Sequence, residues 1–311
     1  MFRAGVGSLA IVLGWVLIWW GDQGLGLPSA SDALLFSNPA MSFASMAGST
    51  REQVCGLPAD SLSRSGTLRS VDGGVGGNHP SVAIMSIWAG GWSSWAGPLG
   101  DVNRRCYART HRYAFRNMNH VINNTRPVAW SKILATLALM DERVQNGSGQ
   151  RAFDWIVYVD ADIVLMRPDL PLHRLIPELS TLAHMPGSTT YHQADFIATR
   201  DANGLNTGFF AVRNTPWARR LFRRAWSLEP LAWDCDQPFQ YEQRAFFFLM
   251  EHDRTFAAPL LRTLPACSLS SQLAMRAPAW VQYSEGDFAV HLAGVYDDWA
   301  TGRRDKLRLF Y

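Results

Sequence analysis

Cysteine is scarce in this chain, and the spacing that would indicate a zinc site is absent. The four cysteines are Cys55, Cys106, Cys235 and Cys267, and none forms a C-x-x-C pair. Structural zinc sites usually take paired ligands at such short spacing, so the sequence gives no support for one. An even number of cysteines is compatible with one or two disulfides, whose pairing the sequence leaves open.

An excess of one charge is also missing. Lys and Arg total 29 against 26 Asp and Glu, giving a net charge of +3, and the basic residues form no long runs. Proteins that bind nucleic acid usually gather basic residues into a patch or stripe, so we expect no nucleic-acid partner. There is no internal repeat. With 48% hydrophobic residues in 311, the chain can bury one large core or two modest ones.

Residues 4–20 lack charge altogether and follow Arg3. A helix of this length falls a little short of a hydrocarbon core of about 30 Å, which suits a thin early secretory membrane. We therefore expect a cytosolic tail at 1–3, a transmembrane signal anchor at 4–20, a flexible Ser-, Gly- and Pro-rich stem at 21–80, and a luminal remainder. A cleavable signal peptide is the alternative. Two glycosylation sequons agree with this compartment, Asn123-Asn124-Thr125 and Asn146-Gly147-Ser148.

From residue 81 onward, apolar strand-like segments alternate with amphipathic helical ones. The alternation favours one α/β domain over 81–311, with a mostly parallel sheet flanked by helices. The expected strands are 81–90, 155–162, 208–214 and 287–294, and the expected helices are 130–144, 215–228 and 241–252.

Two carboxylates interrupt the apolar run WIVYVDADIVLM at 155–166. In an extended strand Asp160 and Asp162 project to the same side, and buried carboxylates need a cation, a basic partner or an exposed strand end. Ligands bind at the carboxyl ends of strands in open α/β sheets. One interpretation is therefore a Mg²⁺ or Mn²⁺ site that neutralises a departing diphosphate.

The same run permits two other interpretations. It fits the Asp-x-Asp of phosphatases of the haloacid dehalogenase type, in which Asp160 would attack phosphorus and Asp162 would act as acid and base. Asp297 and Asp298 would then look like the later metal-binding acids of that class. The third interpretation is an exposed acidic strand end without a ligand. The short stretch alone leaves all three open.

Further motifs follow and precede this run in a fixed order. They are NRRCYARTHRYAF (103–115), RPVAWSKI (126–133), FIATRDANGLNTGFFAVRNTPW (196–217), YEQRAFFF (241–248) and EGDFAVHLAG (285–294). With the Asp-x-Asp, this set resembles glycosyltransferase family 34, which contains fungal α-galactosyltransferases and α-mannosyltransferases and plant xyloglucan xylosyltransferases. The resemblance covers about residues 82–295. It implies a GT-A fold, an anchor in the Golgi or endoplasmic reticulum, a nucleotide-sugar donor, Mn²⁺ and retention of anomeric configuration.

The resemblance also implies roles at the metal and donor sites. Asp160 and Asp162 match the family's metal and nucleotide carboxylates, and His291 matches the histidine of its H-x-A-G motif. A neutral imidazole beside two carboxylates suits Mn²⁺. Asn206 and Gly208 lie in an LNTG turn that faces the donor sugar in the family. Without the resemblance, the last three would be read as a core histidine and ordinary turn residues.

Three residues keep two interpretations each. Asp201 either binds sugar hydroxyls or caps the turn, Lys132 either lies near the nucleotide or is solvated, and Glu242 either orients hydroxyls or is an exposed helix acid. Gln243, the amide of the family's acid-amide pair, is a poor nucleophile that would stabilise positive charge on the sugar ring, which favours a front-face route.

One position departs from the family. Plant relatives have a lysine after H-x-x-G that reaches the diphosphate, whereas Tyr296 stands at that offset here, with Arg303 and Arg304 as possible substitutes. We expect transfer of a hexose, first galactose from UDP-galactose, to a glycan hydroxyl, with mannose or xylose as alternatives. A homo- or hetero-oligomer with other glycosyltransferases is a further expectation, and an inactive binding subunit is the remaining alternative.

Overall fold

The structure is a computed structural model that describes residues 80–89, 96–179, 194–202, 204–228, 241–253, 255–256, 261–273, 278 and 280–293. The expected tail and anchor, the stem up to residue 79, and all positions from 294 onward, including Tyr296, Asp297 and Asp298, lie outside these residues. Within the described ranges, no helix is long and apolar enough to cross a membrane.

A six-stranded sheet forms the centre, in the order β2-β1-β3-β6-β5-β7. Strand β1 runs parallel to β2 and β3, and β5 runs parallel to β7, whereas β6 is antiparallel to both of its neighbours. The mostly parallel sheet predicted from the sequence is therefore confirmed. The strands are β1 (Val82–Ile87), β2 (Ala114–Met118), β3 (Trp155–Val159), β5 (Phe196–Asp201), β6 (Gly204–Arg213) and β7 (Leu261–Pro265).

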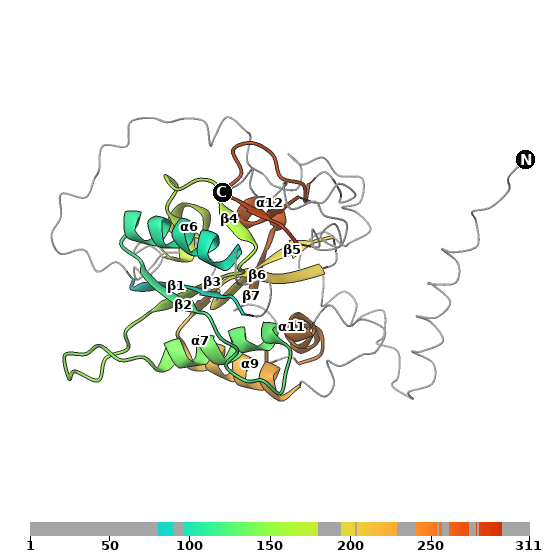
Figure 1. The fold of residues 1–311 in the computed structure, drawn as a ribbon. Helices are drawn as coiled ribbons and strands as arrows, with labels where there is room; N and C mark the ends of the chain where they lie inside the picture. The colour runs from blue at the N-terminus through green and yellow to red at the C-terminus, as the bar shows by residue number, and fades with distance from the viewer. Residues whose placement is uncertain are drawn as a thin grey trace, which may run out of the picture. The chain divides into compact units, whose positions relative to one another are not determined.

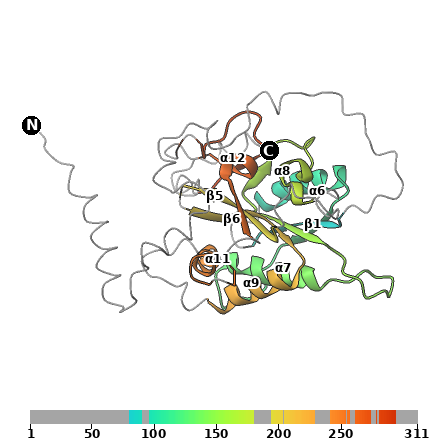
Figure 2. The same ribbon diagram turned by 180° about the vertical axis from the view of Figure 1, so that it is seen from behind.

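Helices cover both faces of this sheet. Helix α6 (Ala96–Thr110) lies on one face, and α7 (Ser131–Asp141), α9 (Pro216–Ser227) and α11 (Tyr241–His252) lie on the other, as Figures 1 and 2 show from opposite sides. Strands β1 and β3 are buried throughout and almost entirely apolar, with Ser86 as the polar exception in β1, as expected for strands packed on both faces. Their alternate residues enter two separate hydrophobic clusters, one under α6 and one under α7, α9 and α11.

The connections create a topological switch point beside β1. The chain passes from β1 through α6 to β2, then through η1 (Val128–Trp130) and α7 to β3, which pairs with the other edge of β1. Helices α6 and α7 lie on opposite faces of the sheet (Figure 1), so the strand order reverses its direction between β1 and β3. Open α/β sheets bind ligands at the carboxyl ends of the strands on either side of such a reversal.

A small second sheet, in the order β4-β9-β8, joins distant parts of the chain. Strand β4 (Ile163–Leu165) pairs antiparallel with β9 (Ala289–His291), with Ile163 opposite His291. Strand β8 (Ser271–Gln272) pairs with β9 on its other side, with Gln272 opposite His291. This sheet brings the late histidine to the Asp-x-Asp. The short elements α8 (Leu172–Leu175), η2 (Pro177–Leu179) and α12 (Ala266–Leu269) complete the described fold.

Several predicted elements are confirmed and three are corrected. Strands β1 and β9 and helices α9 and α11 lie where the sequence predicts them. The helix expected over 130–144 ends at Asp141, because Glu142 adopts an extended conformation (ψ 136°) and Arg143 bridges to Arg151 in an antiparallel hairpin. The predicted LNTG turn is wrong, since Asn206 and Gly208 lie within strand β6.

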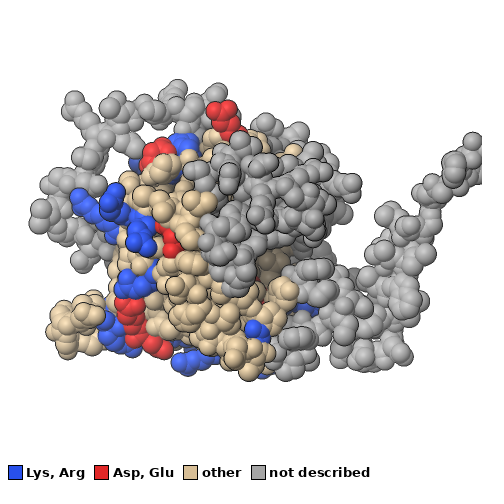
Figure 3. Space-filling view, in the orientation of Figure 1, with Lys and Arg blue, Asp and Glu red and all other residues tan. Residues whose placement is uncertain are grey.

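The Asp-x-Asp itself is not extended. Strand β3 ends at Val159, and Asp160 to Asp162 form a turn before β4. The two carboxylates therefore converge through the turn rather than through the pleat of one strand. Elsewhere, Cys267 is disulfide-bonded and Cys106 is free and exposed, in agreement with the expected one or two disulfides. The face drawn in Figure 3 mixes basic and acidic side chains, as the balanced composition suggests.

Candidate active site

The backbone of the Asp-x-Asp turn is held from three directions. The amide of Asp160 donates to the carbonyl of Gly208 at 2.8 Å, and the amide of Leu292 donates to the carbonyl of Asp162 at 3.0 Å. Arg104, fully buried in α6, donates from Nη1 to the carbonyls of Asp160 (3.3 Å) and Ile163 (3.0 Å). The turn is therefore tied to β6, to the end of β9 and to α6, which restricts where its carboxylates can point.

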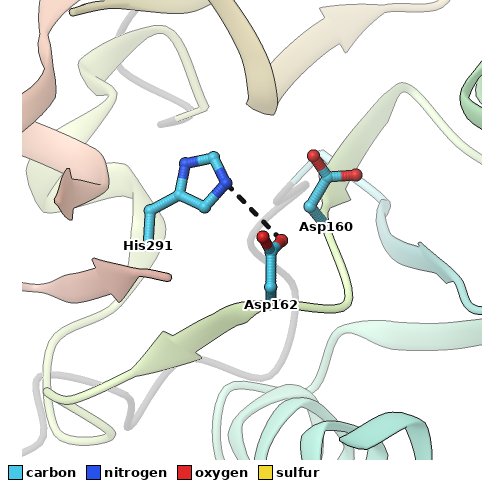
Figure 4. Close-up of side chains that lie close together, drawn as sticks. All are labelled: Asp160, Asp162 and His291. Carbon is cyan, nitrogen blue, oxygen red and sulfur yellow. Dashed lines mark ion pairs between the residues drawn. The ribbon is translucent and has the colours of Figure 1, made fainter. Parts of the chain in front are cut away.

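Asp160, Asp162 and His291 converge on one point (Figure 4). One potential ligand atom from each lies within 4.8 Å of the others. His291 Nε2 lies 3.5 Å from Asp162 Oδ1, and both side chains are nearly buried. Burial lowers the pKa of His291, but the charges of Asp162, Asp160 and Asp201 outweigh it and raise the pKa above the usual value. Two carboxylates and an imidazole form a donor set suited to a divalent cation such as Mn²⁺.

Gly208 lies directly against this cluster. A β-carbon added there would lie 2.6 Å from His291 Cε1, 2.9 Å from Asn206 Oδ1 and 3.0 Å from Asp160 Oδ2. Real side chains do not approach so closely, so only glycine allows these three groups to surround the position. The predicted close backbone approach at Gly208 is thus visible in the contacts.

Lys132 is buried in an ion pair rather than solvated. Its Nζ lies 2.8 Å from Glu242 Oε1 and 3.4 Å from Asp160 Oδ1, and it is also 3.4 Å from the carbonyl of Thr207. Burial opposes the charge, but the two carboxylates outweigh it and raise the pKa of Lys132. The ammonium therefore stays charged and neutralises part of the surrounding negative charge. The solvated alternative for Lys132 is wrong.

The acid-amide pair, Glu242 and Gln243, lies in the first turn of helix α11 and contacts Thr207 of β6. Thr207 Oγ1 donates to Glu242 Oε1 at 2.8 Å, and the Thr207 amide donates to Gln243 Oε1 at 3.0 Å. Glu242 is only 3% exposed, so its interpretation as an exposed helix acid is also wrong. Both side chains are held at the edge of the same strand that carries Asn206 and Gly208.

Asp201 and Asn206 belong to a buried hydrogen-bond network. Asn206 Nδ2 and Gln272 Nε2 each donate to Asp201 Oδ2 at 2.7 Å, and the Gly208 amide donates to Asn206 Oδ1 at 2.8 Å. Asp201 thus accepts hydrogen bonds from two side-chain amides. The network links the start of β6 to β8 and, through β8, to the strand of His291.

A pocket of about 260 Å³ adjoins the metal-ligating cluster. It lies at the switch point, where β1 and β3 end and η1 begins. Both apolar and charged side chains line it. The described lining residues are Ile87, Trp88, Ala89, Val128, Ala129, Lys132, Tyr158, Asp160, Ala161 and Asp162. Its size and mixed lining suit part of a polar, anionic ligand such as a nucleotide.

The sequence reasoning missed four residues that support the site. Tyr158 donates its hydroxyl to Asp160 Oδ1 at 2.5 Å, and burial together with the Asp160 charge raises the pKa of Tyr158 well above its usual value. Arg104, Thr207 and Gln272 are the others. Each of these last three lies inside a helix or strand whose local pattern gives no signal, because its partners are distant in sequence.

Comparison with known proteins identifies the family of this chain. The sequence profile of the galactosyl transferase GMA12/MNN10 family, which corresponds to glycosyltransferase family 34, matches residues 101–297. The chain belongs to this family. "Probable alpha-1,2-galactosyltransferase gmh1" of Schizosaccharomyces pombe is 25% identical over 216 residues, 62% of this chain and 61% of that protein. "Probable alpha-1,2-galactosyltransferase gmh2" of the same yeast is 25% identical over 229 residues, 66% and 61% respectively.

The family member thus spans 61% of the length of these two curated relatives. Among solved structures, the "Crystal structure of a glycosyltransferase involved in the glycosylation of the major capsid of PBCV-1" superposes with a TM-score of 0.51 at 16% identity, covering 69% of this chain and 94% of that one. At this identity the similarity concerns the fold alone. With the mixed sheet and its flanking helices, it establishes the predicted GT-A fold.

Proposed function

We propose that this family member is a retaining glycosyltransferase that moves galactose from UDP-galactose to a glycan hydroxyl with the help of Mn²⁺. The observation that carries the proposal is the convergence of Asp160, Asp162 and His291 beside the pocket at the ends of β1 and β3. The choice of galactose rests on the two yeast relatives, which are named as probable galactosyltransferases. Mannosyl and xylosyl transfer remain the alternatives within the family.

The residues present fit a divalent metal. Asp160, Asp162 and His291 would hold it, and Gly208 leaves the space between them open. Such an ion, when bound, neutralises charge on a departing diphosphate. On the protein side, Lys132 adds a fixed positive charge close to Asp160, which lowers the repulsion that an anionic donor would meet.

The acid-amide pair divides its roles. The Glu242 carboxylate is paired with the Lys132 ammonium, with 2.8 Å between Oε1 and Nζ, so it is not free to act as a base. Gln243 is oriented by the Thr207 amide, and a carboxamide is a poor nucleophile that can stabilise positive charge on a sugar ring. This arrangement favours a front-face route to retention, in which the leaving phosphate accepts the proton of the acceptor hydroxyl. Asn206 and Asp201 would contact the sugar or hold the strand that does.

We also propose that the chain is a type II membrane protein of the Golgi or endoplasmic reticulum with a luminal catalytic domain. Support comes from the uncharged segment 4–20 and from an exposed sequon in the hairpin after α7. There, the Ser148 amide donates to Asn146 Oδ1 at 3.0 Å. An N146Q variant expressed in a eukaryotic cell should lose one glycan on a gel; identical mobility with and without glycosidase, in both proteins, would contradict luminal exposure.

The deciding experiment is thermal unfolding of the full chain in detergent with UDP, GDP or a phosphomonoester, each with and without Mn²⁺. A ligand that binds only the native state stabilises it by about 2.7 kcal/mol at a hundred times its dissociation constant. We expect a Mn²⁺-dependent shift with UDP, and transfer from UDP-galactose above UDP-xylose and GDP-mannose. A shift with GDP instead would favour mannose, and a shift with the phosphomonoester alone would favour the phosphatase.

A histidine pair provides the matched control. H291A should abolish the Mn²⁺-dependent part of the UDP shift, measured from the metal-free melting temperature of the variant itself, while the domain still folds. H111A changes a histidine in the turn after α6 whose Nε2 is bonded to the Pro168 carbonyl at 2.8 Å, and it should bind as the wild type does. Unchanged binding by H291A would remove His291 from the metal site. Nucleotide binding without any transfer would point to the inactive-subunit alternative.

A further inference from the structure

The two oxygens of Asp160 lie in different surroundings. Oδ1 accepts the Tyr158 hydroxyl at 2.5 Å and lies 3.4 Å from Lys132 Nζ. Oδ2 lies on the side of Gly208 and His291, since a β-carbon at Gly208 would be 3.0 Å from Oδ2 and 2.6 Å from His291 Cε1. One oxygen of this carboxylate is therefore held by protein donors while the other faces the position where the three candidate ligands meet.

Asp160 needs such a restraint more than the other two ligands. Its side chain is 27% exposed, against 9% for Asp162 and 6% for His291. The latter two are fixed by burial and by the β4-β9 pairing, whereas Asp160 stands at the pocket wall after the strand has ended. An exposed carboxylate that is free to rotate would lose conformational entropy on binding a metal.

Tyr158 is itself rigid. It is nearly buried in β3, and its ring stacks on Phe210, the residue opposite it in β6, at 5.1 Å between centroids and an interplanar angle of 18°. The Lys132 ammonium lies 4.7 Å from the same ring centroid. A hydroxyl on a ring fixed in this way can restrain the carboxylate that it contacts.

We propose that Tyr158 is a positioning residue of the metal site, whose hydroxyl fixes the Asp160 carboxylate so that Oδ2 is presented beside His291. The inference rests on the proposed function, since it concerns the same metal. Hydrogen bonds from a hydroxyl to a carboxylate are short and strong, and loss of such an outer partner typically costs about 10- to 100-fold in metal affinity.

The test compares two tyrosine-to-phenylalanine variants of the full chain. Y158F keeps the ring and its stacking but removes the hydroxyl. Y107F removes an equally buried hydroxyl, which donates to the Leu170 carbonyl at 2.7 Å, outside the site. Mn²⁺ binding is measured directly from the electron paramagnetic resonance signal of the free ion, with UDP present, and Mn²⁺ is then titrated into the transfer assay.

We expect Y158F to raise the Mn²⁺ concentration for half-saturation about tenfold or more, with turnover at saturating Mn²⁺ changed far less. Y107F should match the wild type in both. Equal Mn²⁺ curves for Y158F and wild type would overturn the inference, even if Y158F melts at a lower temperature, because that would show a purely structural role. If the wild type binds no Mn²⁺ with UDP, the proposed metal-dependent function fails, and the inference with it.

Discussion

The absence of a side chain at Gly208 allows His291, Asn206 and Asp160 to surround this position closely. We predict that G208A lowers Mn²⁺-dependent nucleotide binding more than tenfold, because the new methyl group would overlap His291 and Asp160 Oδ2. The domain should still fold, since the displaced groups are polar and lie outside the two main hydrophobic clusters. Isothermal titration of Mn²⁺ and UDP measures the first effect, and the circular dichroism melting curve measures the second.

Gly147 supplies a control of the opposite kind. It has φ +74° and nothing within 4 Å of an added β-carbon, so G147A is strained but meets no neighbour. G147A should cost about 1 kcal/mol of stability and leave nucleotide binding unchanged. If G208A also left nucleotide binding unchanged, the close approach of His291 and Asp160 to Gly208 would not be needed for that binding.

At the scale of elements, the Lys132–Glu242 pair joins α7 to α11 beneath β6. Removing one partner of a buried ion pair leaves an uncompensated charge, so K132M should destabilise the domain by about 3 kcal/mol. For a domain of this size that lowers the melting temperature by about 6 to 12 °C. K132M/E242Q should recover part of the loss, because the second change removes the unpaired carboxylate.

The matched control is an exposed pair of similar chemistry. Arg116 Nη2 lies 2.6 Å from Glu142 Oε1, but the side chains are 41% and 34% exposed. R116M should therefore cost less than about 1 kcal/mol. Thermal unfolding of K132M, E242Q, K132M/E242Q and R116M gives the comparison; a loss in K132M/E242Q equal to the sum of the two single losses would show that the two residues do not interact.

The same elements show what the sequence can and cannot reveal. Periodicity locates helices α9 and α11 and strand β1, because their patterns reflect which face each element buries. It misplaces the end of α7, since Glu142 has no breaking residue beside it and leaves the helix to join a hairpin. It also misreads Asn206, whose N-x-G pattern suggests a turn although the residue pairs with Thr199 of β5 within strand β6.

The candidate site is predictable only where its residues form local motifs. Asp160, Asp162 and His291 could be proposed from the motif order, and the structure brings them together. The burial of Glu242 could not, because it depends on Lys132, whose helix lies far away in the sequence. Tyr158 reads as an ordinary strand residue, since only the turn after β3 directs Asp160 back to its hydroxyl.

At the scale of the whole molecule, the strand order decides where the ligand can bind. Strand β1 lies between β2 and β3, and α6 connects β1 to β2 on one face of the sheet, whereas α7 connects β2 to β3 on the other. The pocket lies at the carboxyl ends of β1 and β3. Of the candidate metal ligands, Asp160 and Asp162 line this pocket, whereas His291 of β9 lies beside them and is not among its lining residues. A substitution at a lining residue that is not a candidate ligand should therefore affect nucleotide binding and spare metal binding.

Ala129 lines the pocket in η1 and is not one of the candidate metal ligands. A phenylalanine there would occupy much of a pocket of about 260 Å³, so A129F should weaken UDP binding more than tenfold. Mn²⁺ binding in the absence of nucleotide should change little, because no ligand residue is altered. V102F, on the exposed face of α6 at a residue 63% accessible, adds the same ring outside the pocket and should leave both unchanged. Equal UDP affinity in A129F and V102F would place the nucleotide elsewhere and would separate the pocket from the metal-ligating cluster beside it.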